Sequence, residues 1–104
     1  MDIVANLEAM LERGTDTASL RFALASRYLS DGNVERALEH AAVAVDLDRD
    51  YSAAWKLLAQ AQTQAGLDDH AAQTFRQGIE VAERCGDQQA AKEMRVFLKR
   101  LGRA

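Results

Sequence analysis

Three aspartates at alternate positions come closest in this sequence to a set of metal ligands. Asp46, Asp48 and Asp50 have the spacing found at the start of a calcium-binding loop. Such a loop also needs glycine at its sixth position and a bidentate glutamate at its twelfth, where this sequence has Tyr51 and Leu57. We therefore interpret the aspartates as a polar turn and helix cap, and we expect no calcium site.

Histidine and cysteine are the other side chains that could bind a metal or attack a substrate. His40 and His70 have no second His or Cys at metal-ligand spacing, and both fall beside apolar stripes of expected helices. We expect a surface or boundary position for each. Cys85 follows Arg84, whose charge could lower the pKa of the thiol. As a single cysteine it has no resolving partner, so we expect an incidental thiol.

No catalytic motif accompanies these residues. The sequence lacks a glycine-rich phosphate loop, a nucleophile elbow and a paired-histidine motif. Its six glycines fall mostly at the ends of expected helices. The sequence therefore predicts a protein that is not an enzyme and that uses no cofactor or metal.

Composition narrows the class further. The 104 residues are enough for one domain, and 48% are hydrophobic, which is typical of a folded chain. The net charge of -3 argues against a general nucleic-acid binder. No apolar run approaches the roughly 20 residues of a membrane span, and the N-terminal residues do not resemble a signal peptide. We expect a cytoplasmic protein that binds neither nucleic acid nor membrane.

The strongest regularity is a displacement of 34 residues. The residues repeated at this distance are Leu24, Ala25, Gly32 and Ala37, which recur as Leu58, Ala59, Gly66 and Ala71. A fixed period of this size indicates a stacked repeat in which neighbouring units together bury a core. The functional question therefore becomes what binds to the stack.

Six amphipathic helices account for most of the chain. The apolar spacing predicts them over 3–12, 17–30, 34–47, 52–65, 69–84 and 88–101. Glycines mark their ends, and short polar side chains mark their starts. The candidate N-caps are Asp16, Asn33, Asp50 or Ser52, Asp68 and Asp87. Because the chain has no proline, none of these helices is interrupted.

The period and the helix–turn–helix pattern resemble those of the tetratricopeptide repeat. The second unit carries Trp55, Leu58, Ala59, Ala71, Phe75 and Gly78 at the expected places, and the first carries Leu24, Ala25, Tyr28, Ala37, Ala41 and Ala44. Arg21 and Gln62 stand where this pattern has aromatic residues. The resemblance implies an all-α fold in which antiparallel helical hairpins stack into a right-handed superhelix. Segments 7–14, 51–58 and 89–94 also resemble small bacterial proteins of this family.

The same frame organises the whole chain as one domain over 1–104. Ile3, Leu7 and Met10 lie 34 residues before Ala37, Ala41 and Ala44, so 3–12 is expected to be an N-terminal half-repeat. Repeat one spans 17–47 and repeat two spans 52–84. The last helix, 88–101, fits as a C-terminal cap after a two-residue shift, which places Ala91, Met94 and Leu98 in the core.

The resemblance also implies a binding surface, because the first helices of such repeats line a concave face. The side chains that it places there are Phe22, Ser26 and Leu29, then Lys56, Gln60 and Thr63, then Lys92, Val96 and Lys99, with Ser19, Ser30, Ala53, Gln64, Gln89 and Arg100 beside them. Helical spacing agrees for Lys56, Gln60 and Thr63, which share one face. The groove would be apolar near the N-terminal end and cationic near the C-terminal end.

These features predict a non-enzymatic module that binds a protein or peptide, with an apolar anchor and an acidic end in the ligand. Lys56 and Gln60 resemble half of the clamp with which some family members grip a terminal carboxylate, while Phe22 and Ser26 replace the other half. The alternative is a self-associating accessory subunit, a homodimer formed through an apolar stripe. That stripe is Phe97, Leu98 and Leu101, which would otherwise simply cap the core.

Overall fold

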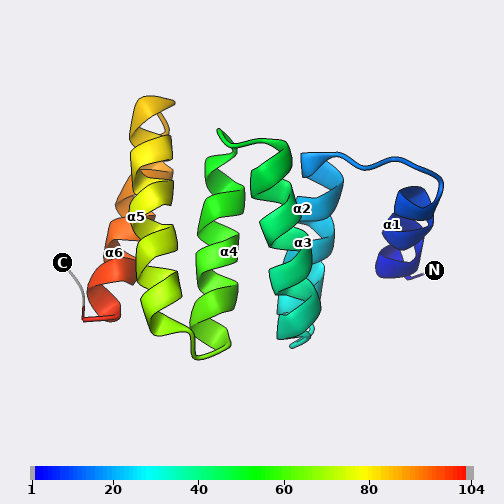
Figure 1. Cartoon of the computed structure of the whole chain (residues 1–104), viewed down its shortest axis with the longest axis horizontal. Helices are drawn as coiled ribbons and strands as arrows, with labels where there is room; N and C mark the ends of the chain where they lie inside the picture. Colours follow the sequence, from blue (N-terminus) through cyan, green and yellow to red (C-terminus); the bar gives the residue numbers. More distant parts are fainter. Residues whose placement is uncertain (1, 103–104) are drawn as a thin grey trace.

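The computed structural model describes residues 2–102 and contains six α-helices in that range. They are α1 (Ile3–Glu12), α2 (Ala18–Ser30), α3 (Val34–Leu47), α4 (Ser52–Gln64), α5 (Asp68–Arg84) and α6 (Gln88–Arg100). The helices follow one another as antiparallel hairpins in a row, with α1 and α6 at its two ends (Figure 1). The prediction of an all-α helical repeat is confirmed, with helix ends displaced by at most one residue.

The first repeat begins with a different cap from the one expected. Thr17, not Asp16, caps α2, because the Thr17 hydroxyl accepts from the Leu20 amide at 3.1 Å. Asp16 is instead held by Arg21, whose Nε and NH2 atoms donate to its two carboxylate oxygens at 2.8 and 3.0 Å. A two-pronged bond of this kind is stronger than a single cap bond. Arg21, which stands at an aromatic position of the repeat pattern, thus has a defined partner.

Two further caps also differ from expectation. Tyr51 precedes α4 and Leu67 precedes α5, and neither makes a side-chain cap bond. Ser52 instead donates to the carboxylate of Asp87 at 2.7 Å, and so ties the start of α4 to the turn before α6. Asp87 also caps α6 as predicted, by accepting from the Ala90 amide.

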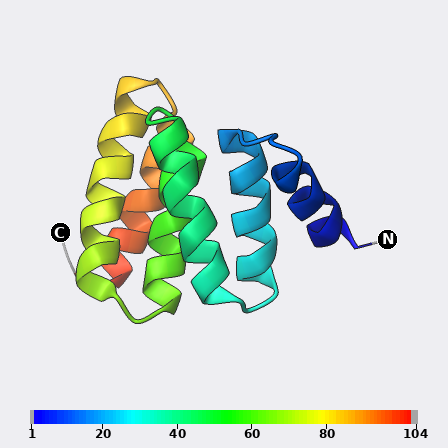
Figure 2. The same cartoon turned by 45° about the vertical axis from the view of Figure 1, so that its right-hand side comes forward.

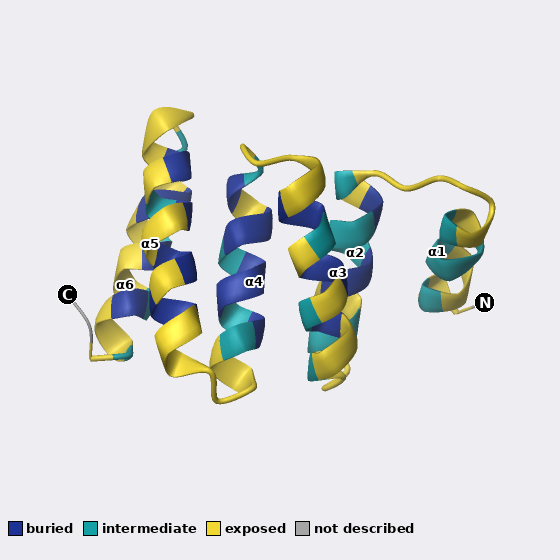
Figure 3. Ribbon diagram, in the orientation of Figure 1, coloured by how far each residue is buried: buried dark blue, intermediate teal, exposed yellow. Residues whose placement is uncertain are grey.

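The hairpins α2/α3 and α4/α5 pack most closely within themselves, and α3 against α4 joins them. Helix α6 lies against both α5 and α4, as Figure 2 shows at the C-terminal end. Small residues line these contacts, as the repeat pattern required. The fully buried alanines include Ala25, Ala37, Ala44, Ala59, Ala71 and Ala91. Figure 3 shows buried residues along α4, near the centre of the row, and along the side of α5 that faces it.

Gly78 marks the closest approach of helices in the core. A Cβ atom added there would lie 2.6 Å from Sδ of Met94 and 3.0 Å from Cβ of Trp55. The first distance is shorter than real contacts allow and the second is tighter than most, so a side chain at position 78 would require Met94 to move and α4 and α5 to shift slightly apart. Met94 itself is fully buried, as are Ala91 and nearly all of Leu98, so the prediction that these three residues lie in the core is confirmed.

The N-terminal helix differs from the others because none of its residues is buried. Ile3 is 49% exposed and Met10 is also exposed. Figure 3 shows α1 with only exposed and half-buried residues. The helix therefore leans on α2 without entering the core.

The two histidines take different positions. His70 is exposed on α5, in line with the expected surface or boundary position. For His40 that expectation is wrong, because the residue is only 3% exposed and lies between α2 and α3. Arg21 and Tyr28 of α2 cover it and supply polar and stacking contacts, which an apolar-stripe argument does not anticipate.

Candidate interaction groove

Three hollows are lined by residues of the helices α1, α2, α4 and α6. The first, of about 320 Å³, lies between α1 and α2 and is lined by Ile3, Leu7, Phe22, Ala23, Ser26, Arg27 and Ser30. The middle one, of about 250 Å³, is lined by Leu29, Gln60, Thr63, Gln64 and Phe97. The third, of about 270 Å³, is lined by Lys56, Glu93, Val96, Phe97 and Arg100. We call these three hollows together the groove.

The middle hollow is mainly apolar. Its floor includes Phe97, which is half-buried and stacks on the buried Phe75 with ring centres 5.7 Å apart. Thr63 uses its hydroxyl to donate to the carbonyl of Ala59 at 2.9 Å, so its hydrogen is taken up by its own helix. The amides of Gln60 and Gln64 lie at the rim and can both donate and accept hydrogen bonds. The arrangement suits an apolar side chain flanked by a peptide backbone.

The third hollow contains an internal ion pair. Lys56 Nζ donates to Glu93 Oε1 at 2.9 Å, and Gln89 donates to the other oxygen at 3.2 Å. These two bonds, that of Lys56 first, hold the pKa of the Glu93 carboxyl below its usual value. Lys56 is therefore already partnered by a carboxylate of its own chain.

Phe97 joins the middle and third hollows and lies between two cations. The Lys56 ammonium is 5.9 Å from the ring centre, and the Arg100 guanidinium carbon is 5.6 Å from it. Cations at this distance are attracted by the negative face of an aromatic ring. Within residues 2–102, Arg100 has no carboxylate partner, so it carries the unpaired positive charge of the third hollow.

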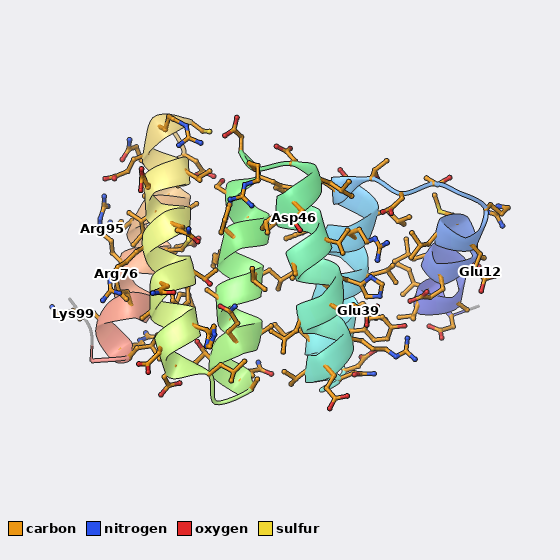
Figure 4. All side chains as sticks on the ribbon, viewed as in Figure 1. Glu12, Glu39, Asp46, Arg76, Arg95 and Lys99 are labelled. Atoms are coloured by element: carbon orange, nitrogen blue, oxygen red, sulfur yellow. The ribbon has the colours of Figure 1, made fainter. Side chains whose placement is uncertain are left out.

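The predicted site residues are distributed over the groove, with two exceptions. Phe22 and Ser26 line the first hollow, Leu29, Gln60 and Thr63 the middle one, and Lys56 and Val96 the third. Lys92 and Lys99 are exposed but line none of the three. Figure 4 places Lys99 at the C-terminal edge of the molecule, beyond α6.

Sequence reasoning did not assign Glu93 to the site, and it placed Phe97 in the apolar stripe of a possible homodimer. Glu93, Phe97 and Arg100 recur at helical spacing and share one face of α6, which was an available signal. Leu98 lies in the core as expected, so it is not available to the apolar stripe of the self-association alternative. Phe22 also contributes to packing, since its ring lies 5.1 Å from that of Tyr51.

The acidic turn before α4 is held by arginines. Asp46 accepts from Arg49 at 3.3 Å, and Asp50 accepts from Arg84 at 2.7 Å. Asp48 accepts from the backbone amide of Asp50. Over residues 2–102, no group of three or more His, Cys, Asp or Glu side chains is arranged to hold a metal ion. The turn is therefore part of the packing between α3, α4 and α5.

Comparison with known proteins places the chain in a family. No family model matches it. The TPR repeat-containing protein PA0015 of Pseudomonas aeruginosa is 48% identical over 102 residues, which cover 98% of this chain and 97% of that protein. This chain belongs to the tetratricopeptide repeat family. Members of the family are in general non-enzymatic scaffolds, and the fold supports protein–protein interaction.

Solved structures agree with this assignment. Protein BPP2914 from Bordetella parapertussis superposes with a TM-score of 0.86 at 41% identity, covering 98% of this chain and 89% of that one. A tetratricopeptide repeat domain protein from Salinibacter ruber superposes in its crystal structure with a TM-score of 0.78 at 30% identity, covering 84% and 97%. In the described part of this tetratricopeptide repeat protein, none of the helices has the length and apolar character needed to cross a membrane.

Proposed function

We propose that this protein is a non-enzymatic adaptor that captures a peptide segment of a partner protein in the groove. The observation that carries the proposal is that the middle and third hollows adjoin, because Phe97 lines both. A peptide laid along them would meet an apolar floor next to an unpaired cation. That sequence of surfaces fits an aliphatic or aromatic side chain followed by an acidic end.

Each part of the groove has a role in this proposal. Leu29 and Phe97 take the apolar anchor, and the amides of Gln60 and Gln64 bind the peptide backbone. Arg100 takes the carboxylate, since Lys56 is already paired with Glu93. Lys92 and Lys99 lie outside the hollows, and as exposed cations they attract an acidic ligand at longer range.

A displayed library of short random peptides with free C-termini tests the proposal. We expect selection for an apolar residue close to the free carboxylate, and binding of the free acid about tenfold tighter than of the amidated peptide. Thr63→Arg fills the middle hollow from an exposed position and should abolish binding. Gln73→Arg makes the same addition on the exposed side of α5 and should not. Selected peptides that bind both variants equally would place the site elsewhere.

A second pair of variants tests the cation. Arg100→Glu should strongly reduce the affinity for the free-acid peptide. Lys99→Glu makes the same charge change on the same helix but outside the hollow, so it should reduce that affinity only slightly. An equal loss of affinity in both variants would mean that Arg100 acts only through the net charge of the protein and does not contact the ligand. If no peptide is selected and the mass in solution rises with concentration, self-association replaces peptide capture as the function.

A further inference from the structure

One carboxylate of helix α1 contacts two other helices. Glu8 Oε1 accepts a hydrogen bond from the Tyr28 hydroxyl at 2.8 Å, and the same oxygen lies 3.5 Å from Nε2 of His40. Tyr28 of α2 and His40 of α3 thus both lie close to one oxygen of Glu8 on α1. Tyr28 and His40 are themselves stacked, with ring centres 5.6 Å apart and planes 7° from parallel.

The hydrogen on His40 can be assigned from its other neighbour. Arg21 NH1 lies 3.0 Å from Nδ1 of His40, and a guanidinium group can only donate. Nδ1 must therefore accept, which leaves the imidazole neutral with its hydrogen on Nε2, the ring nitrogen that lies 3.5 Å from Glu8 Oε1. Asp16 fixes Arg21 in turn through two bonds. The ring is thus held in the tautomer that carries its N–H on the side of Glu8.

We propose that Tyr28 and His40, oriented by Arg21, form a carboxylate-binding site that Glu8 fills from within the chain, and that this bond fastens α1 as a detachable wall of the first hollow. The ligand class is a carboxylate carried on a helix, and the occupant is this chain's own α1. His40 is buried, so its side of the site is shielded from water, while the Glu8 side chain is 31% exposed.

Apolar contact alone holds α1 weakly, which gives the bond its importance. None of the residues of α1 is buried, and Ile3 and Met10 are exposed. Segments with few buried apolar contacts open locally at small cost while the rest of the fold stays closed. Loss of the Glu8 bond should therefore change the opening of α1 and leave α4, α5 and α6 unchanged.

Detachment would alter the groove. Ile3 and Leu7 form the α1 side of the first hollow, opposite Phe22 and Ser26 of α2. With α1 docked the groove has three hollows, and with α1 released it has two. This consequence for ligand length rests on the proposed function, whereas the fastening of α1 does not.

Hydrogen exchange of the full-length protein without any peptide tests the fastening. We compare the wild type with Glu8→Gln, with Tyr28→Phe, and with the control Glu12→Gln. Glu12 is an exposed carboxylate on the same helix, labelled in Figure 4 on the side of α1 away from α2. We expect amide exchange over residues 3–13 to become about tenfold faster in Glu8→Gln and Tyr28→Phe. Exchange in Glu12→Gln should match the wild type.

Two results would overturn the proposal. One is exchange of α1 in Glu8→Gln at the rate of the Glu12→Gln control. The other is acceleration spread equally over all helices, which would make Glu8 a general contributor to stability. Nitrogen chemical shifts of the His40 ring give an independent readout: a hydrogen on Nδ1 in the wild type would also refute the site. All these results are independent of peptide selection, so either proposal can fail alone.

Discussion

Lys56 and Glu93 form an ion pair across α4 and α6, with 2.9 Å between Nζ and Oε1. Their side chains lie at the third hollow, where the sequence indicated a cation free to bind a ligand. The pair means that the protein's own carboxylate occupies the position next to Lys56. An acidic ligand must therefore use Arg100, or displace Glu93.

Removing the Glu93 carboxylate should strengthen the binding of an acidic ligand. In Glu93→Gln, Lys56 loses its partner and becomes available, and the charge of the hollow rises by one. We expect a selected free-acid peptide to bind several-fold to about tenfold more tightly, and its amidated form to change little. Fluorescence anisotropy of labelled peptides measures both affinities.

The matched control is Glu83→Gln. Glu83 of α5 is paired with Arg95 of α6, so its loss also removes one carboxylate and one ion pair, but outside the groove. An affinity gain of equal size in Glu83→Gln would attribute the effect to net charge. No gain in Glu93→Gln would mean that Lys56 does not contact the ligand.

Gly78→Ala should destabilise the fold, although alanine is the better helix former. Helix propensity alone favours alanine by about 1 kcal/mol. The added methyl would lie 2.6 Å from Met94 Sδ, which can move, and 3.0 Å from Trp55 Cβ, which cannot do so without moving α4. We expect a net loss of about 1–3 kcal/mol in urea unfolding. Gln77→Ala, at an exposed neighbouring position, is the control, and a stabilised Gly78→Ala would show that the helices can separate freely.

The sequence predicted the helices and the core well for a physical reason. Positions 34 apart meet the same packing environment, so small residues such as Ala25 and Ala59 report helix contacts directly. The polar pairs carry no such period. Lys56 and Glu93 are 37 residues apart, and Tyr28 and Glu8 are 20 apart, and each pair depends on how α6 or α1 is turned. The division into two repeats and two half-repeats stays a prediction about repeat boundaries.

Gln62 stands where the repeat pattern has an aromatic residue, and this substitution should cost stability. Its side-chain oxygen is buried and has no hydrogen-bond partner within residues 2–102. An unsatisfied buried polar atom costs about 1–3 kcal/mol, so Gln62→Leu should raise the free energy of unfolding by about 1 kcal/mol. Gln73→Leu, on the exposed side of α5, should leave it within about 0.5 kcal/mol. A destabilised Gln62→Leu would show that this oxygen is bonded in solution.

His40 should make the protein less stable in mild acid. Burial lowers the pKa of His40 below its usual value of 6.5, and Arg21 and Arg36 lower it further, while Glu8 and Glu39 oppose the shift. The unfolded chain therefore binds a proton near pH 6.5 that the folded chain does not yet bind. The free energy of unfolding should fall as the pH decreases through about 6.5 towards the lower folded pKa, and above that range His40 adds no pH dependence.

Urea unfolding at about pH 7.5 and about pH 5.5 measures this contribution, because the two values bracket the unfolded pKa. In His40→Gln the loss of stability between the two pH values should be smaller than in the wild type, since no imidazole remains to be protonated on unfolding. His70→Gln removes the exposed histidine of α5 and should keep the full loss. Equal losses in the wild type and His40→Gln would mean that His40 is protonated as readily in the folded protein as in the unfolded chain. That result would also contradict the neutral tautomer that the Arg21 contact requires.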